Sequence, residues 1–110
     1  MRYAVFGDVH ANLEALGAVL EECEKLEVES YLCIGDIVGY NADPSICMEK
    51  IKKLPLAGVV KGNHDEQASE DTELAGFNAQ AAMAIEWTRN NLTTEQRDWL
   101  RKLRLTMQIG

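Results

Sequence analysis

Three short apolar runs recur along the chain, and each is followed by a polar segment that contains glycine. The runs are predicted strands over Tyr3–Phe6, Tyr31–Ile34 and Leu56–Val60. Short, continuously apolar runs are typical of strands in a parallel sheet, which has no solvent-facing side. The pattern therefore predicts a parallel sheet that is covered on both faces.

Helical periodicity occupies the segments between the predicted strands. A helix is expected over Asn12–Leu26, with Asn12 as its N-cap. A shorter helix is predicted to begin at Pro44, with Asp43 as its cap. Its inner face would be formed by Ile46, Cys47, Ile51 and Leu54. The alternation β-α-β-α-β predicts an α/β fold in which all three strands end at the same edge of the sheet.

The strand pattern stops after Asp65. The acidic segment Glu66–Glu73 has no strand signal and is predicted to be a surface loop or frayed turn. A helix is predicted over Asn78–Asn91. Its apolar face would carry Ala81, Ile85, Thr88 and Leu92, and Trp87 and Trp99 are expected to pack inside the protein.

A second helix and a further strand are predicted near the end of the chain. The capping-box pattern at Thr93–Gln96 predicts a helix that continues through Leu103. Leu105–Ile109 is predicted to begin a fourth strand. Since a domain does not normally end on the first residues of a strand, we expect residues 1–110 to be the N-terminal part of a single domain.

Composition and charge narrow the range of partners. The chain has 110 residues, is 46% hydrophobic and carries a net charge of −7. This charge opposes a nucleic-acid duplex or a membrane as the main partner, because both require basic patches. It is compatible with a small phosphorylated substrate, because bound divalent cations reverse the local field. The cysteines Cys23, Cys33 and Cys47 show no CxxC pairing and are predicted to be buried, reduced thiols of a cytoplasmic protein.

Polar clusters follow the predicted strands at near-equal spacing. Asp8 and His10 follow the first strand and lie close enough in sequence to reach one cation. Asp36 follows the second strand, between glycines that let the backbone turn sharply. Gly62-Asn63-His64-Asp65 follows the third strand, and both histidines of the chain lie in these loops. Because parallel strands end at one edge, we expect the three clusters to converge.

Together, Asp-x-His, Gly-Asp-x-x and Gly-Asn-His-Asp resemble the calcineurin-like metallophosphoesterase superfamily, and in particular its small prokaryotic single-domain members. The resemblance covers nearly the whole chain and implies the N-terminal half of that family's sandwich fold. It implies that Asp8 and His10 bind one metal ion, that Asp36 bridges two, and that Asn63 binds the second. Manganese is the expected ion, with Fe, Zn, Ni or Co as alternatives.

The resemblance also implies roles in catalysis. A hydroxide activated by two divalent metal ions would attack the phosphorus of a phosphomonoester or phosphodiester. His64 would protonate the leaving oxygen. Asp65 would either orient His64 or cap a turn. Asn12 and Tyr40 are candidate substrate-binding residues, although Asn12 could serve only as a helix cap.

Two departures from the family pattern are informative. The protein-phosphatase branch has Asp-Arg where this chain has Gly39-Tyr40, which favours small phosphoesters, phosphodiesters or dinucleoside polyphosphates over phosphoproteins. The histidines of the family's second half have no counterpart after His64 in these residues. We therefore expect little turnover by this chain alone, and a complementing C-terminal fragment or a homo-oligomer as partner.

Other function classes fit the residues less well. A non-catalytic scaffold of the same fold would not need His64, which this chain has. An aspartyl-phosphate phosphatase with Asp8 as nucleophile would need a second carboxylate where this chain has His10. A dinucleotide-binding fold would need a G-x-G-x-x-G motif after the first strand, and the sequence has none there.

Overall fold

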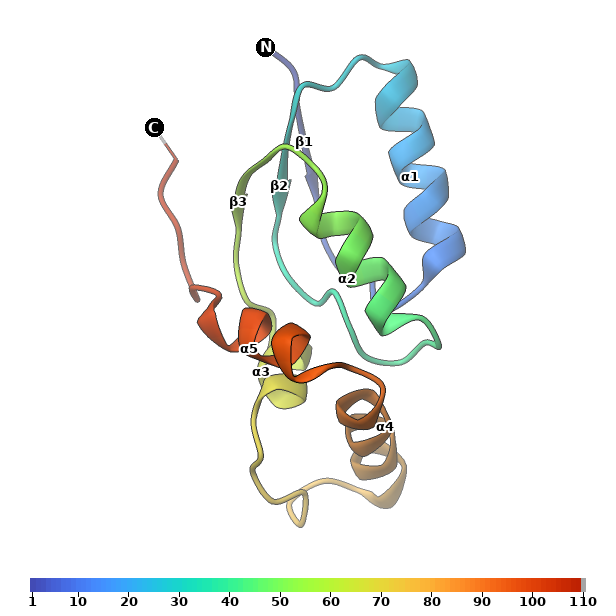
Figure 1. Ribbon diagram of the computed structural model, residues 1–110, viewed down its shortest axis with the longest axis vertical. Coiled ribbons are helices and arrows are strands. Elements are labelled where there is room, and N and C mark those ends of the chain that lie inside the picture. Colours follow the sequence, from blue (N-terminus) through green and yellow to red (C-terminus); the bar gives the residue numbers. More distant parts are fainter. Residues whose placement is uncertain (110) are drawn as a thin grey trace.

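Three parallel strands form the central sheet in the computed structural model of the chain, which describes residues 1–109 (Figure 1). The strands are β1 (Tyr3–Phe6), β2 (Ser30–Cys33) and β3 (Leu56–Val59), and they lie in the order β1-β2-β3. The predicted strands are confirmed to within one residue at either end. The predicted α/β class is also confirmed.

The register of the sheet brings the three strand ends together. Phe6 pairs with Cys33, and Cys33 pairs with Val59. Each strand therefore releases the chain into a loop at the same edge, as expected for parallel strands.

Both crossover helices cover the same face of the sheet. Helix α1 (Leu13–Lys25) joins β1 to β2, and α2 (Pro44–Lys52) joins β2 to β3 and contacts α1. The strand order always advances in one direction, and parallel crossovers are almost always right-handed, so both helices must lie on one side. The opposite face exposes Val5 and Ile34, which are 63% and 58% accessible. The prediction that both faces are covered is therefore wrong for the described residues.

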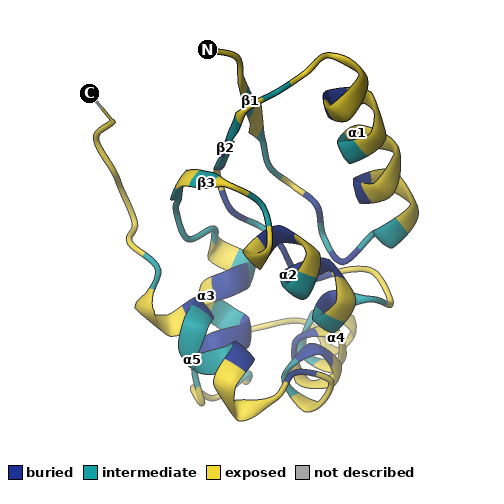
Figure 2. Cartoon of the chain, turned by 45° about the horizontal axis from the view of Figure 1, so that its top comes forward, coloured by how far each residue is buried: buried dark blue, intermediate teal, exposed yellow. Residues whose placement is uncertain are grey.

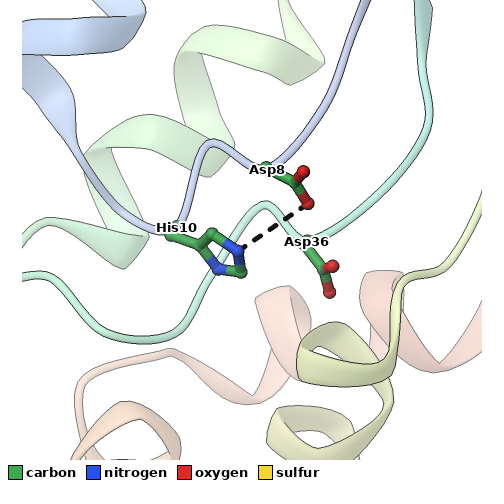
Figure 3. A group of neighbouring side chains, drawn as sticks. All are labelled: Asp8, His10 and Asp36. Atoms are coloured by element: carbon green, nitrogen blue, oxygen red, sulfur yellow. Dashed lines mark ion pairs between the residues drawn. The ribbon is translucent and has the colours of Figure 1, made fainter.

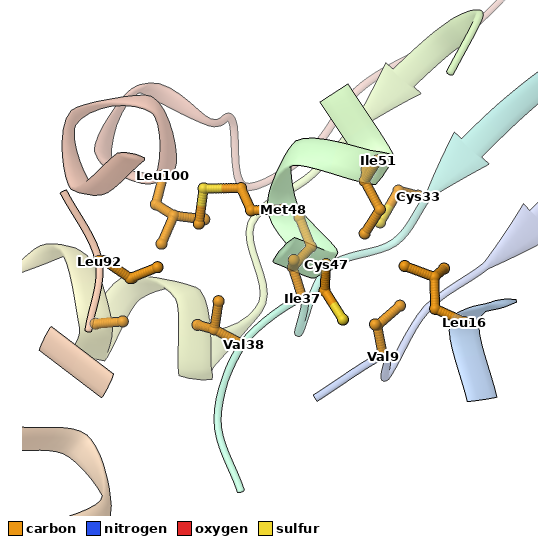
Figure 4. Close-up of a cluster of buried hydrophobic side chains, with 11 residues drawn as sticks. Val9, Leu16, Cys33, Ile37, Val38, Cys47, Met48, Ile51, Leu92 and Leu100 are labelled. Atoms are coloured by element: carbon orange, nitrogen blue, oxygen red, sulfur yellow. The ribbon is translucent and has the colours of Figure 1, made fainter. Parts of the chain in front are cut away.

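The core fills the space between the sheet and these helices and extends to the later helices (Figure 4). It is formed by Val9, Leu16, Cys33, Ile37, Val38, Cys47, Met48, Ile51, Ala68, Leu92 and Leu100. On α2 the inner face contains Cys47 and Ile51 as predicted, but Met48 takes the place expected for Ile46. Ile46 is 48% exposed because it lies on the outer side of this short helix.

Three further helices follow the sheet: α3 (Asn63–Ser69), α4 (Ala79–Asn90) and α5 (Thr94–Lys102). Helix α3 contacts both α4 and α5, and the buried sides of these helices face one another (Figure 2). The positions of α4 and α5 are confirmed, including the capping box between Thr93 and Gln96. The prediction of a loop over Glu66–Glu73 is wrong for Glu66–Ser69, which completes α3 and buries Ala68 and Ser69, and it is confirmed for residues 70–73.

Arginine side chains stabilise the end of α3. The Arg97 guanidinium donates to the carbonyl oxygens of Ala68 at 2.9 Å and Glu70 at 2.8 Å. It also pairs with the Asp71 carboxylate at 2.7 Å, and this contact holds the pKa of Asp71 below its ordinary value. These bonds satisfy carbonyl groups that a helix end leaves without partners.

The segment after α5 makes little regular structure. A single parallel bridge joins Val60 to Arg104, and the Lys61 amide donates to the Arg104 carbonyl oxygen at 2.7 Å. The predicted strand start at Leu105–Ile109 forms no ladder. Trp99 packs against the core as predicted, whereas Trp87 is 43% exposed. Across residues 1–109, every helix is too short or too polar to cross a membrane.

The three cysteines are free and buried, as predicted, and this generates a test of the core. Burial raises the pKa of the Cys33 and Cys47 thiols to about 11. Because the thiolate is the reactive form, neither should react with iodoacetamide in the native protein at about pH 8. Peptide mapping after labelling in urea should show all three cysteines modified. Rapid labelling of Cys33 or Cys47 without denaturant would contradict this packing.

Candidate metal centre

The loops after β1 and β2 run side by side at the edge where the strands end. The amides of Asp8, His10 and Ala11 donate to the carbonyl oxygens of Gly35, Asp36 and Ile37 at 3.1, 2.9 and 2.8 Å. The hydrogen-bonded pairing of the two strands thus continues into their loops. This continuation fixes the polar residues of one loop opposite those of the other.

Three predicted metal ligands converge at this edge (Figure 3). One ligand atom from each of Asp8, His10 and Asp36 lies within 4.8 Å of the others. His10 Nε2 is 3.7 Å from an Asp8 carboxylate oxygen. Two carboxylates and an imidazole at this separation form a donor set suited to a divalent transition metal ion.

The His10 ring is oriented by a backbone carbonyl group. Its Nδ1 atom lies 3.1 Å from the Val38 carbonyl oxygen. A carbonyl oxygen can only accept a hydrogen bond, so in the neutral ring Nδ1 carries the proton and Nε2 the lone pair. This tautomer leaves Nε2, on the side of Asp8, available to a cation, as in most histidine ligands of metals.

The backbone at all three ligands is in the left-handed region. The φ angles are 52° at Asp8, 48° at His10 and 55° at Asp36. Residues other than glycine adopt this conformation uncommonly, and such strain persists only where surrounding structure enforces it. Strain at three neighbouring candidate ligands is typical of a functional site.

The β3–α3 turn is pressed against the Asp36 loop. The His64 amide donates to Asp36 Oδ1 at 3.0 Å. Gly62 lies so close that an added Cβ atom would overlap the Asp36 carboxylate and its backbone nitrogen. A glycine is therefore required there to let the third motif approach the second.

The Asp65 carboxylate is fully buried beneath these loops. It accepts hydrogen bonds from the amides of Asp36 at 2.8 Å, Ile37 at 2.9 Å, Val38 at 3.3 Å and Gly62 at 3.0 Å. Burial raises the pKa of its carboxyl group, and the backbone donors act in the opposite direction. Its bonds go to backbone amides, which favours the turn-cap interpretation over orientation of His64.

His64 belongs to an aromatic cluster with His10 and Tyr40. The ring centroids lie 4.8 Å apart for His10 and His64, 4.8 Å for His10 and Tyr40, and 4.6 Å for Tyr40 and His64. Gly39 has a φ of +97°, and a Cβ atom there would lie 2.6 Å from His64 Nδ1. The absence of a side chain at Gly39 thus leaves room for the His64 ring, and the Tyr40 ring packs against it.

The remaining predicted site residues lie at the margin of this cluster. Asn12 caps α1 by accepting from the Ala15 amide at 3.0 Å, and it also lines a cavity of about 260 Å³ with Asp8 and His10. Asn63 is exposed at the start of α3, one residue after the contact between Gly62 and Asp36.

Sequence reasoning missed Asn41 and the carbonyl group of Val38. The Asn41 side chain donates to the His10 carbonyl oxygen at 2.9 Å, and Val38 orients the His10 ring. Val38 occupies a variable position of the second motif, and Asn41 lies outside the motifs. Only the position of Asn41 shortly after the second motif could have suggested a contact with the first.

The geometry agrees with a family comparison. The model of the calcineurin-like phosphoesterase family matches residues 1–106. The chain belongs to this family. All three motif loops lie inside the matched range, so the match includes the metal centre described above.

Relatives of this metallophosphoesterase chain are longer. The chain is 41% identical over 105 residues to an uncharacterised protein of Methanocaldococcus jannaschii, a match that covers 96% of the chain and 43% of the relative. A crystal structure of a metallophosphoesterase from Sphaerobacter thermophilus superposes with a TM-score of 0.84 at 38% identity. That match covers 100% of the chain and 44% of the solved structure. The chain thus spans less than half the length of these relatives.

Cation binding tests the centre directly. We expect Mn²⁺ to bind the chain, and Asp36→Asn to weaken binding by more than roughly tenfold, because the variant loses a charged ligand. Glu21→Gln removes a carboxylate from the exposed side of α1 and should leave the affinity unchanged. Electron paramagnetic resonance of free Mn²⁺ measures the Mn²⁺ affinity of each variant. An equal loss of Mn²⁺ affinity in the two variants would show that binding depends only on the net charge of the protein.

The requirement for glycine at position 62 gives a second test. Gly62→Ala should lower the free energy of unfolding by about 1–3 kcal/mol, because the methyl group overpacks the Asp36 loop. Gly17→Ala is the matched control, since a Cβ atom at this helical glycine meets nothing within 4 Å. It should stabilise the protein by about 0.5–1 kcal/mol. Urea titration measures the free energy of unfolding of both variants. An unchanged value for Gly62→Ala would contradict the close contact between Gly62 and the Asp36 loop.

Proposed function

We propose that the chain forms part of the active site of a metal-dependent phosphoesterase that hydrolyses small phosphomonoesters or phosphodiesters. The observation that carries this proposal is the convergence of Asp8, His10 and Asp36 on strained, left-handed backbone. The family match supports the same reaction class. We propose two divalent cations, with manganese as the first choice because oxygen and imidazole ligands suit it.

The residues present fit such cations. Asp8 and His10 would hold one cation, and Asp36 has a carboxylate oxygen beyond the one that accepts from the His64 amide. Asn63, at the exposed start of α3, would contribute its amide oxygen to the second. Divalent cations in such a site supply charge that polarises a phosphoryl group and makes water acidic near neutral pH.

The aromatic cluster supplies the group for proton transfer. We propose that His64 donates a proton to the oxygen that leaves phosphorus. Its backbone is fixed by Asp36, and its ring is packed against Tyr40 and His10. Tyr40 and Asn12 are proposed to border the bound phosphoester, because each lines the same cavity as Asp8 and His10.

The proposal extends to the cellular location of the protein and to the source of the remaining metal ligands. Three free, buried thiols are typical of proteins in a reducing compartment, which supports a cytoplasmic location. We propose that further ligands come from a complementing C-terminal segment or from a second copy of the chain. The length of the relatives favours the former.

Phosphate binding and turnover together test the function. Inorganic phosphate should bind the 110-residue chain only when Mn²⁺ is present, because the protein itself is acidic. Hydrolysis of bis-p-nitrophenyl phosphate by this chain alone should be slow or undetectable, because the second cation has few ligands here. Calorimetry and absorbance assays measure the two quantities.

Each outcome has a distinct meaning. Robust hydrolysis would show that the ligand set is already sufficient and would overturn the expectation of an incomplete site. Cation binding without any phosphate binding would contradict the phosphoesterase proposal and favour a scaffold of the same fold. Asp36→Asn should abolish the phosphate binding, while Glu21→Gln should retain it.

A further inference from the structure

A second cavity of about 220 Å³ opens beside His64. It lies between the Gly39-Tyr40 turn and helices α3 and α4. Its walls include Tyr40, His64, Phe77, Ala81, Ala84 and Ile85. None of the cation-binding candidates Asp8, His10 or Asp36 lines it.

The walls of this cavity are mainly apolar. The lining contains no Asp, Glu, Lys or Arg, and its polar side chains are those of Tyr40, His64, Gln67 and Thr88. The hydroxyl group of Thr88, which also lines the cavity, donates to the Ala84 carbonyl oxygen at 2.9 Å and so has its proton occupied within α4. A charged group placed here would lose its hydration without gaining a counter-charge. An apolar group would gain free energy by leaving water.

Tyr40 is shared by this cavity and by the cavity at the candidate metal centre. The same side chain lines the cavity that contains Asp8, His10 and Asn12. Its ring contacts the rings of both His10 and His64, which also contact each other, so the three rings form a triangle with sides of 4.6–4.8 Å. The two cavities are therefore neighbours that share Tyr40. His64 lines the apolar cavity, and its ring lies 4.8 Å from that of His10, which lines the other.

We propose that this cavity binds the organic leaving group of the phosphoester and that the preferred group is uncharged, apolar and about the size of one aromatic ring. The inference rests on the proposed function, because it places the phosphoryl group beside Asp8, His10 and Asp36. A dry cavity of about 150 Å³ lined by apolar side chains is known to accept benzene, so the volume here is sufficient. Sugar phosphates and phosphopeptides carry polar or charged leaving groups that these walls do not match.

The position of Ala84 makes the cavity easy to close. Ala84 is exposed on α4 and lines the cavity, so Ala84→Phe would fill the space without burying new polar groups. Met83→Phe is the matched control, because Met83 is 70% exposed on the same helix and does not line the cavity. Both variants add one aromatic ring to α4.

Binding of two phosphonates by the 110-residue chain tests the proposal. With Mn²⁺ present, phenylphosphonate should bind at least roughly tenfold more tightly than methylphosphonate, because its ring is buried in the cavity. Ala84→Phe should remove this preference while retaining methylphosphonate binding. Met83→Phe should keep the preference. Calorimetry measures the affinities of both phosphonates for the unmodified chain and for each of the two variants, six in all.

Phenol without cation provides a readout that is independent of the phosphoesterase reaction. Methyl resonances of Ala81 and Ile85 should shift on titration with phenol, and the shifts should be lost in Ala84→Phe. Shifts without phosphonate binding would retain the cavity as an apolar site and overturn the proposed function. Equal affinities for the two phosphonates, or unchanged Ala81 and Ile85 resonances, would overturn the leaving-group site.

Discussion

One buried carboxylate joins the loops that form the candidate metal centre. Asp65 accepts from three consecutive amides after β2 and from the Gly62 amide before α3. An unsatisfied buried donor costs about 1–3 kcal/mol, so this arrangement strongly favours one position of each loop. The position of Asp36, the direction of the Val38 carbonyl group and the start of α3 all depend on it.

The strain at the ligands is maintained by this same framework. Asp8, His10 and Asp36 adopt left-handed backbone while their amide and carbonyl groups pair across the two loops. The pairing continues from a sheet whose inner face is buried against α1 and α2. The free energy gained in that core therefore holds side chains in positions that isolated loops would not keep.

Particular residues show why some features could be predicted from sequence and others could not. The strand ends, the Asn12 cap and the convergence of the motifs follow from local pattern and from the geometry of parallel sheets. Helix α3 was missed because Glu66–Ser69 has no local signal, and its end is completed by carbonyl bonds from the distant Arg97. The aromatic packing of Tyr40 on two histidines is likewise a tertiary contact without a periodic signature.

The acidic character of the centre is consistent with cation binding before substrate binding. Asp8 is 76% exposed at its side chain and lies 3.7 Å from His10 Nε2, and Asp36 accepts a hydrogen bond from the His64 backbone amide, so among the described residues neither carboxylate is held by a lysine or an arginine. Carboxylates preorganised in this way repel each other and also repel phosphate. A divalent cation removes both repulsions, and it would stabilise the folded chain because it binds a site that the unfolded chain lacks. The net charge of −7 would thus make recognition of the proposed anionic ester conditional on the cation, whereas binding of an apolar group in the cavity beside His64 would carry no such condition.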